Sequence, residues 1–255
     1  MGNPTTLISK GVPTERIEEV RDFFNEPQNY LDRRRFDIRV RVEITQEFLA
    51  KHRFTRILDI GCGDGSISIP LLSPERRLIL LDIAPNMLAL AHLQVPPPLH
   101  SNVTFVNGDF LTAFSDSESY DVIICIGVLA HVLAPCDVIS KIATLLRPGG
   151  ILVLEFTDST HLLRRLLSWY QALLGLLRPT LYKVRPLSRT RVLEATMTAG
   201  FEILSDFRYT FPWPGVHRIF SQDTLYRLVK KAFGTVGRNR HRWLGSEYIC
   251  CLRRN

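Results

Sequence analysis

The 255-residue sequence contains no apolar run near the roughly 18 residues that a membrane-spanning helix requires. Residues 1–12 also lack the apolar core of a secretory signal, so we expect a chain that is neither exported nor embedded in a membrane. Five cysteines are present, an odd number, and none forms a Cys-x-x-Cys pair. This pattern predicts reduced thiols, no metal site and a cytoplasmic protein.

Acidic residues are scarce in the C-terminal part of the chain. Residues 1–160 contain 15 Lys and Arg against 20 Asp and Glu, whereas residues 161–255 contain 17 against 5. The formal net charge of the whole chain is +7. This asymmetry suggests that the C-terminal part makes peripheral contact with an anionic membrane or an acidic partner. A solvated basic surface is the alternative.

Short, near-continuous apolar runs alternate with helical patterns through the middle of the chain. Such runs are typical of strands buried on both faces of a parallel sheet. We therefore predict an α/β fold with a doubly wound, mostly parallel seven-stranded sheet. The last two strands, with a helix between them, suggest an antiparallel pair at one edge of the sheet. The predicted strands are 56–60, 78–82, 103–106, 121–126, 151–156, 201–209 and 247–252, and the predicted helices around them are 66–72, 85–92, 136–146, 188–199 and 222–233.

Two helices are predicted before the first strand. The first covers 14–26 and is stopped by Pro27, and the second covers about 31–51 with an apolar stripe along one side. We predict an N-terminal helical cap over 1–52, a main domain over 53–255, and a helical lid inserted at about 159–186, after the fifth strand. In the lid, 161–178 places leucines on one face and arginines on the other. This segment either covers an apolar pocket or lies on an anionic membrane surface.

A glycine-rich loop follows the first strand, in the run Asp59-Ile60-Gly61-Cys62-Gly63-Asp64-Gly65. Glycines allow a sharp turn and let a ligand approach the backbone closely. The G-x-G-x-G spacing differs from the dinucleotide fingerprint G-x-G-x-x-G, and the lysine of a P-loop is missing. An acid beside the loop would repel a pyrophosphate and would suit a ligand with an ammonium group and no phosphate. A tight turn without a ligand is the alternative.

This loop resembles motif I of the class I (Rossmann-like) S-adenosylmethionine (SAM)-dependent methyltransferases of the small-molecule type. Asp82, at the end of the second strand, matches the family's acid that binds the two ribose hydroxyls. Segments 86–88, 107–110, 120–128 and 146–150 resemble the later motifs in order. For Asp82 and Asp109, a helix or turn cap is the alternative role. The resemblance implies SAM as the cofactor, held by Tyr30, Asp59, Gly61, Cys62, Gly63, Gly65, Asp82, Ile83, Met87, Asp109, Phe110 and Gly127.

His131 lies just beyond the fourth strand, and ligands in open α/β sheets bind beyond the carboxyl ends of strands. Small-molecule members of the family resemble this stretch and have a histidine at the matching place. The resemblance therefore implies that His131 is the general base, for which an imidazole is suited near neutral pH. A histidine that only packs against the cofactor is the alternative.

Three functions fit the sequence. The favoured one is methylation of a small, apolar or aromatic acceptor, with O-methylation preferred. An RNA or protein methyltransferase that uses the basic C-terminal part is the second, and a SAM-binding protein that does not methylate is the third. The fourth strand lacks the Asn-Pro-Pro-Tyr pattern of amino-methylating nucleic-acid enzymes, so no nucleic-acid partner is expected.

Overall fold

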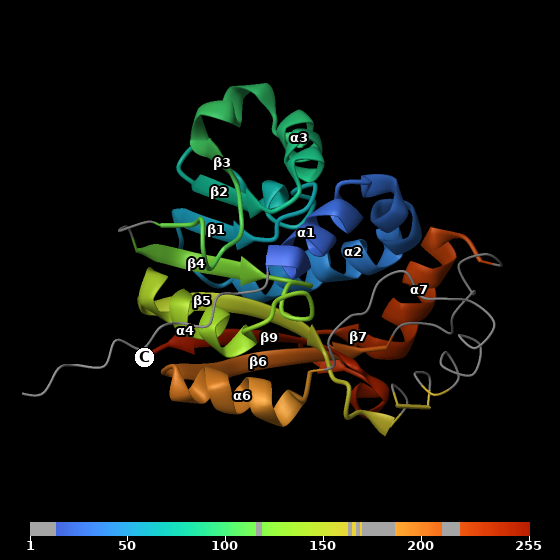
Figure 1. Cartoon of the computed structure of the whole chain (residues 1–255). Coiled ribbons are helices and arrows are strands. Elements are labelled where there is room, and N and C mark those ends of the chain that lie inside the picture. Colours follow the sequence, from blue (N-terminus) through green and yellow to red (C-terminus); the bar gives the residue numbers. More distant parts are fainter. Residues whose placement is uncertain (1–13, 116–118, 163–164, 167–168, 170–186, 211–219) are drawn as a thin grey trace, which may run out of the picture.

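A seven-stranded sheet forms the centre of the molecule in the computed structural model, which describes residues 14–115, 119–162, 165–166, 169, 187–210 and 220–255 (Figure 1). The strand order is β3-β2-β1-β4-β5-β9-β6. All neighbouring pairs are parallel except those of β9, which runs antiparallel to both β5 and β6. This arrangement confirms the predicted doubly wound α/β fold with an antiparallel pair at one edge. The strands are β1 Arg56–Ile60, β2 Arg77–Asp82, β3 Val103–Asn107, β4 Tyr120–Cys125, β5 Leu146–Thr157, β6 Phe201–Tyr209 and β9 Glu247–Arg254.

The central strands are buried on both faces, as their apolar runs predict. Side chains such as Ile57 and Val122 point to one face and enter a cluster with helices α2 (Pro27–Leu49) and α7 (Gln222–Phe233). Side chains such as Leu58 and Ile123 point to the other face and pack with α4 (Pro135–Leu145) and α6 (Arg189–Thr198). The alternation of strand residues thus builds two hydrophobic layers, one on each side of the sheet.

The N-terminal helices are α1 (Thr14–Phe24) and α2. Pro27 does not only stop α1, because it also occupies the first turn of α2, where the missing N–H of proline has no cost. The predicted apolar stripe of α2 is buried, with exposed fractions between 0 and 6% at Phe36, Val40, Ile44 and Phe48. This stripe enters the same cluster as the central strands. The division into a cap over 1–52 and a main domain over 53–255 stays a prediction.

The helix predicted over 66–72 was wrong. The chain after the glycine loop makes turns and then a single 3₁₀ turn, η1 (Ile69–Leu71). Pro70 explains the difference, because it donates no hydrogen bond and disfavours the α conformation of the residue before it. The remaining predicted elements agree to within a few residues, and α3 covers Pro85–Gln94. Gly200 ends α6 with a φ of 86°, as expected for a helix C-terminal glycine.

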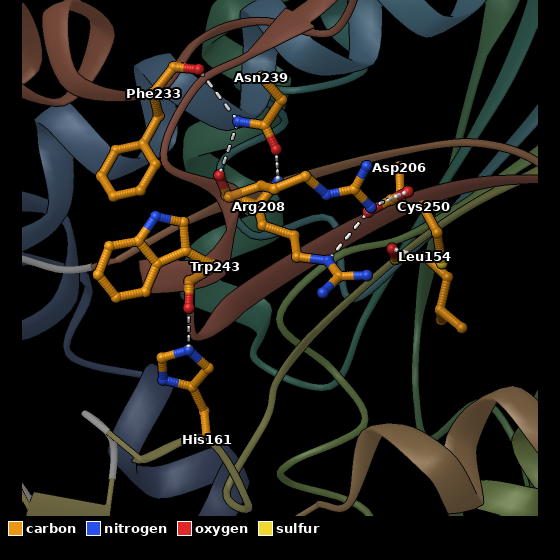
Figure 2. Close-up of polar contacts among 9 residues, drawn as sticks. Leu154, His161, Asp206, Arg208, Phe233, Asn239, Trp243 and Cys250 are labelled. Atoms are coloured by element: carbon orange, nitrogen blue, oxygen red, sulfur yellow. Dashed lines mark hydrogen bonds and ion pairs between the residues drawn. The ribbon is translucent and has the colours of Figure 1, made fainter.

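Short elements close the C-terminal half of the fold. They are β7 (Gly234–Thr235), β8 (Arg238–Asn239) and η4 (Arg242–Leu244). A further short element, η2 (Pro97–Asn102), precedes β3 in the N-terminal half. Figure 2 shows Asn239 holding β8 against β6: its side chain accepts from Arg208 N and donates to Arg208 O and Phe233 O, at 2.9–3.0 Å. Close to this contact, His161 Nε2 lies within hydrogen-bond distance of Trp243 O, at 2.8 Å (Figure 2).

The predicted lid at about 159–186 lies for most of its length outside the described residues. Of its described side chains, Leu162, Leu166 and Trp169 are exposed by 54 to 72%. None of the helices in the described part of the chain is long and apolar enough to span a membrane.

Candidate functional site

The glycine loop has the positive-φ backbone that its sequence predicts. Gly61, Gly63 and Gly65 have φ values of 66°, 56° and 76°. A Cβ on Gly61 would lie 2.4 Å from Val128 Cγ2, and a Cβ on Gly65 would lie 2.4 Å from Ile69 Cδ1. By contrast, a Cβ on Gly63 would meet nothing within 4 Å. A side chain at Gly61 or Gly65 would therefore displace Val128 or Ile69, whereas Gly63 leaves an open backbone surface.

Asp82 joins the loop to the end of β2. Its Oδ2 accepts a hydrogen bond from Gly63 N and its Oδ1 accepts one from Ala84 N, both at 2.8 Å. Burial raises the pKa of this carboxyl, and hydrogen bonds from the backbone of Ala84, Gly63 and Ile83 oppose that rise. Each carboxylate oxygen has a second lone pair, so the side chain can also accept from two hydroxyl groups. Capping and ribose binding are thus compatible roles for Asp82.

Asp59 acts on the turn that follows the loop. It is 2% exposed, and its Oδ2 accepts from Ser68 Oγ at 2.5 Å. Burial raises the pKa of Asp59 to about 7, although the Ser68 hydrogen bond opposes the rise. The sequence analysis missed Ser68, and the only signal for it was a hydroxyl nine residues after a buried acid. Asp59 therefore stabilises the turn after the glycine loop from its buried position at the end of β1.

The loop after β3 is held from two sides. Asn107 Nδ2 donates to Asp82 O at 3.0 Å and Ile83 O at 3.1 Å. Asp109 Oδ1 accepts from Leu111 N and from Thr112 N and Oγ1, each at 3.0 Å, which is the turn-capping role considered above.

The anchor on the other side of that loop is Lys141 from α4. Its Nζ donates to Phe110 O and Phe114 O at 2.6 Å and to Leu111 O at 3.2 Å. Sequence reasoning missed Lys141, because nothing local marks a lysine that reaches a loop about thirty residues earlier.

The Phe24 ring contacts both His131, the predicted general base, and Tyr30, the predicted cofactor contact from the N-terminal helices. The Phe24 ring, at the end of α1, makes edge contacts with Tyr30 and His131, with centroid separations of 5.5 and 5.1 Å. His131 is half-buried, and its backbone N donates to Val128 O at 2.9 Å. Phe24 was not identified from the sequence, although it connects two residues that were.

The turn between α1 and α2 also contacts the start of α3. Asn25 accepts from Asn86 N at 3.2 Å through its side chain and from Asn86 Nδ2 at 2.8 Å through its carbonyl. Next to Asn86, Met87 is 1% exposed, whereas Ile83 is half-buried. The N-terminal helices therefore contact the segments that follow β2 and β4, beyond the carboxyl ends of these two strands.

Arg41 lies behind Tyr30 and was also missed from the sequence. Its Nη1 donates to Tyr30 Oη at 3.1 Å, and its Nη2 donates to Glu155 Oε1 at 2.9 Å. Gly127, with a φ of 76°, is the neighbouring backbone: a Cβ there would lie 3.5 Å from Arg41 Nη1 and 3.9 Å from Glu155 Oε2. The predicted site residues Tyr30 and Gly127 thus both lie next to the buried ion pair of Arg41 and Glu155.

Residues 51–182, just over half of the chain, match the family described as 'Methyltransferase domain'. The chain therefore belongs to the SAM-dependent methyltransferases, and its cofactor is SAM. The match begins just before β1 and includes the glycine loop, Asp82, Asp109 and Gly127.

Curated relatives are similar over part of their length. Ubiquinone biosynthesis O-methyltransferase from Xanthomonas campestris pv. campestris is 32% identical over 111 residues, which is 41% of this chain and 44% of that protein. The mitochondrial ubiquinone biosynthesis O-methyltransferase of Schizosaccharomyces pombe is 31% identical over 129 residues, 49% of this chain and 46% of that protein. The chain thus spans less than half the length of the curated relatives it matches.

Solved structures share the fold over nearly the whole chain. Magnesium protoporphyrin IX methyltransferase from Synechocystis, with bound S-adenosylhomocysteine (SAH), has a TM-score of 0.63 at 21% identity and covers 94% of this chain and 100% of its own. A possible histamine N-methyltransferase from Thermotoga maritima has the same TM-score and coverage at 17% identity. The [4+2]-cyclase SpnF has a TM-score of 0.55 at 16% identity, with coverages of 85 and 81%. At these identities the likeness concerns the fold alone.

Proposed function

We propose that this methyltransferase transfers the methyl group of SAM to a small, apolar or aromatic acceptor, with oxygen as the favoured acceptor atom. The observation that carries the proposal is the contact of His131 with Phe24, which also contacts Tyr30, beyond the carboxyl end of β4. An apolar ring surface beside a histidine suits a ring-bearing acceptor that loses a proton. The names of the curated relatives, which are O-methyltransferases, support oxygen as the acceptor atom.

We assign the cofactor contacts in two groups. The residues proposed to face the cofactor are Tyr30, Gly61, Gly63, Asp82, Ile83, Asp109 and Gly127. Asp59, Cys62, Gly65, Met87 and Phe110 are buried and are proposed to shape the site from behind. Asp82 fits the ribose because each of its oxygens already accepts one backbone N–H and retains a lone pair.

In the proposed reaction the bound cofactor supplies an electrophilic methyl group on a sulfonium. The residues around it position the acceptor in line with the carbon–sulfur bond and exclude water. His131 would accept the proton of the acceptor hydroxyl while the acceptor oxygen bonds to the methyl group, and the carbon–sulfur bond would break to leave the neutral thioether SAH. Tyr30, held by Arg41, helps to close the site from the N-terminal side.

We also propose that the C-terminal part rests on an anionic membrane surface. The exposed apolar side chains that support this contact are Leu162, Leu166, Trp169 and Trp243. A hydrogen bond between His161 and Trp243 O joins the segment that begins at His161 to the one that contains Trp243. Flotation with anionic vesicles, but not with zwitterionic ones, would support this contact; binding only to acidic proteins or RNA would overturn it. The five free cysteines, four of them buried, fit the reducing cytoplasm.

Two measurements test the main proposal. Calorimetry with SAH and with NAD should show binding of SAH alone. Labelled SAM should then be incubated with a panel of phenols, aromatic amines and a structured RNA, followed by mass spectrometry of labelled products. A labelled phenol ether supports the proposal. Labelled RNA, or SAH binding without methyl transfer to any member of the panel or to fractionated metabolites, would favour one of the two alternatives.

A further inference from the structure

A cluster of charged side chains is buried next to Gly127, and of its members only Arg41 has a part in the function proposed above. Asp37 and Arg41 lie one turn apart on α2, Glu155 lies on β5 and Glu247 begins β9. All four are 0 to 5% exposed. They come from three elements that are distant in the sequence and meet on the face of the sheet that α2 covers.

The cluster is held by a continuous set of contacts. Arg41 Nη2 lies 2.9 Å from Glu155 Oε1 and 3.5 Å from Asp37 Oδ2. Asp37 Oδ1 accepts from Tyr209 Oη at 2.5 Å. Glu247 Oε2 accepts from Thr157 Oγ1 at 2.7 Å, and Glu247 stands opposite both Thr157 and Tyr209 in the register of the sheet.

Negative charge is in excess among the described residues of this cluster, where one guanidinium faces the carboxyl groups of Asp37, Glu155 and Glu247. Within the described residues, Glu155 Oε2 is buried and accepts no hydrogen bond. A buried carboxylate oxygen without a partner is costly, because neither water nor a donor replaces its hydration. A nearby positive charge from outside the cluster would lower that cost.

Gly127 connects this imbalance to the cofactor. Because the residue has no side chain, the free Oε2 of Glu155 is only 3.9 Å from the position that a Cβ would take. Val128, the next residue, fills the space beside Gly61 in the glycine loop. The Oε2 atom of Glu155 therefore lies against the backbone that we assigned to the cofactor.

We propose that the cluster of Asp37, Arg41, Glu155 and Glu247 makes the site prefer the cationic donor SAM over its neutral product SAH. This inference rests on the cofactor contacts proposed above, Gly127 in particular. The two ligands differ by a methyl group and by the positive charge of the sulfonium, so an excess of buried negative charge acts on SAM alone. The same preference favours release of SAH after each methyl transfer.

The expected effect is measurable. Two unit charges about 10 Å apart in a medium with an effective dielectric constant of about 20 change an affinity by about tenfold. Removing one carboxylate charge should therefore lower the ratio of SAM affinity to SAH affinity by about 3- to 10-fold.

The preference should also depend on pH. Burial raises the pKa of Glu247 to about 7; Glu155 and Asp37 add to the rise, and Arg41 and the Thr157 hydrogen bond oppose it. Within the described part of the chain, these groups and Tyr209 on β6 face Glu247. The SAM-to-SAH affinity ratio should rise between pH 6 and pH 8 as Glu247 ionises. Burial also raises the pKa of Asp59 to about 7, so Asp59 adds to the pH dependence of the ratio in the same range. The part that belongs to Glu247 is the difference between the wild type and Glu247→Gln.

The test is calorimetry with SAM, SAH and sinefungin, a cationic analogue with an ammonium in place of the sulfonium, at pH 6 and pH 8. The variants are Glu247→Gln and Glu155→Gln. The control is Glu202→Gln, which removes an exposed carboxylate near the start of β6. Thermal melting checks that each variant is folded, and Glu247→Gln serves if Glu155→Gln is not.

We expect both cluster variants to lose affinity for SAM and sinefungin relative to SAH. The pH dependence of the ratio should be smaller in Glu247→Gln than in the wild type, and the part that Asp59 contributes should remain. The control should match the wild type. An unchanged ratio in Glu247→Gln with intact SAH binding would overturn this inference and leave the proposed function standing. Failure of the wild type to bind SAH would overturn the proposed cofactor contacts themselves.

Discussion

Single residues in this site hold the backbone and remain available to a ligand. Asp82 is the clearest case, because it accepts from Gly63 N and Ala84 N and so fixes both the glycine loop and the approach to α3. A residue with two such bonds is already oriented before a ligand arrives. Changes at this position should affect cofactor affinity more than overall folding.

Asp82→Ala should weaken SAH binding by roughly 1–3 kcal/mol, since two ribose hydroxyls and two backbone N–H groups lose their acceptor. Asp82→Asn, which keeps one acceptor oxygen, should lose less. Calorimetry with SAH measures both, with Asp64→Ala as the control because Asp64 lies in the same loop. Equal affinity of Asp82→Ala and wild type would remove Asp82 from the site.

His131 is the residue whose two roles can be separated by substitution. His131→Ala removes both the imidazole and its contact with Phe24, whereas His131→Phe keeps a ring against Phe24. If His131 is the general base, both variants should lower kcat by roughly 10²–10⁴-fold with SAH affinity nearly unchanged. Single-turnover rates with a labelled acceptor decide. Full activity in His131→Phe would make the residue a packing element only.

At the scale of elements, the loops that we propose to contact the cofactor are held by other parts of the chain. The loop after β1 is tied to β2 by hydrogen bonds from Gly61 N and Cys62 N to Leu81 O, at 2.8 and 3.0 Å. The loop after β3 is anchored by Lys141 from α4. Each loop therefore depends on a partner from another element.

Gly61→Ala should disrupt the first of these loops. The new Cβ would lie 2.4 Å from Val128 Cγ2, and the residue would keep a φ of 66° that side chains disfavour. We expect a loss of roughly 1–3 kcal/mol in unfolding free energy and a large loss of SAH affinity. Gly149→Ala is the matched control, since Gly149 has a φ of 75° but an open Cβ position. Similar SAH affinity in both variants would show that the contact with Val128 is unimportant.

Lys141→Met tests the second loop. The substitution keeps much of the apolar stem but removes the donor to three carbonyl groups, and so should loosen Asp109 and Phe110. SAH affinity should fall by roughly tenfold, a loss of about 1.4 kcal/mol. We propose that Asp109 accepts from the exocyclic amine of adenine, so affinity for S-inosylhomocysteine, which lacks this amine, should fall less. An equal loss for both ligands would mean that Lys141 only supports the fold.

The whole molecule buries several carboxyl groups, and this shapes its stability against pH. Burial raises the pKa values of Asp59 and Glu247 to about 7, above their ordinary values of 3.8 and 4.5. For an acid whose pKa is raised by folding, the folded state holds the proton more tightly than the unfolded state. Its contribution is therefore favourable at low pH and is lost as the pH rises to about 7.

Glu247→Gln should therefore stabilise the protein at pH 8 relative to its effect at pH 5. The expected difference between the two pH values is on the order of 1–3 kcal/mol, because the amide needs no proton to stay neutral. Urea unfolding at both pH values measures it, with Glu202→Gln as the exposed control. The same stability change at pH 5 and pH 8 would contradict a raised pKa for Glu247.

The amino-acid sequence by itself determined the order of the strands and of most helices along the chain, and it located the glycine loop. Apolar runs such as 121–126 are unambiguous because both faces of their strands are buried, and glycines at positive φ leave a local pattern. The predicted helix over 66–72 failed because apolar spacing outweighed Pro70 in that prediction. Asp82 could be identified because it ends a strand beside the loop it holds.

Only the tertiary structure decided which distant side chains meet. Arg41 and Glu155 are 114 residues apart, and Lys141 reaches a loop 31 residues earlier. The sequence shows each of these residues as one charge among many, because charged residues have no periodicity that marks a partner. Sheet register and helix packing bring them within 3 Å, and burial then turns an ordinary charge into a strong interaction. For that reason the cofactor loop was predictable, whereas the charged cluster beside Gly127 was not.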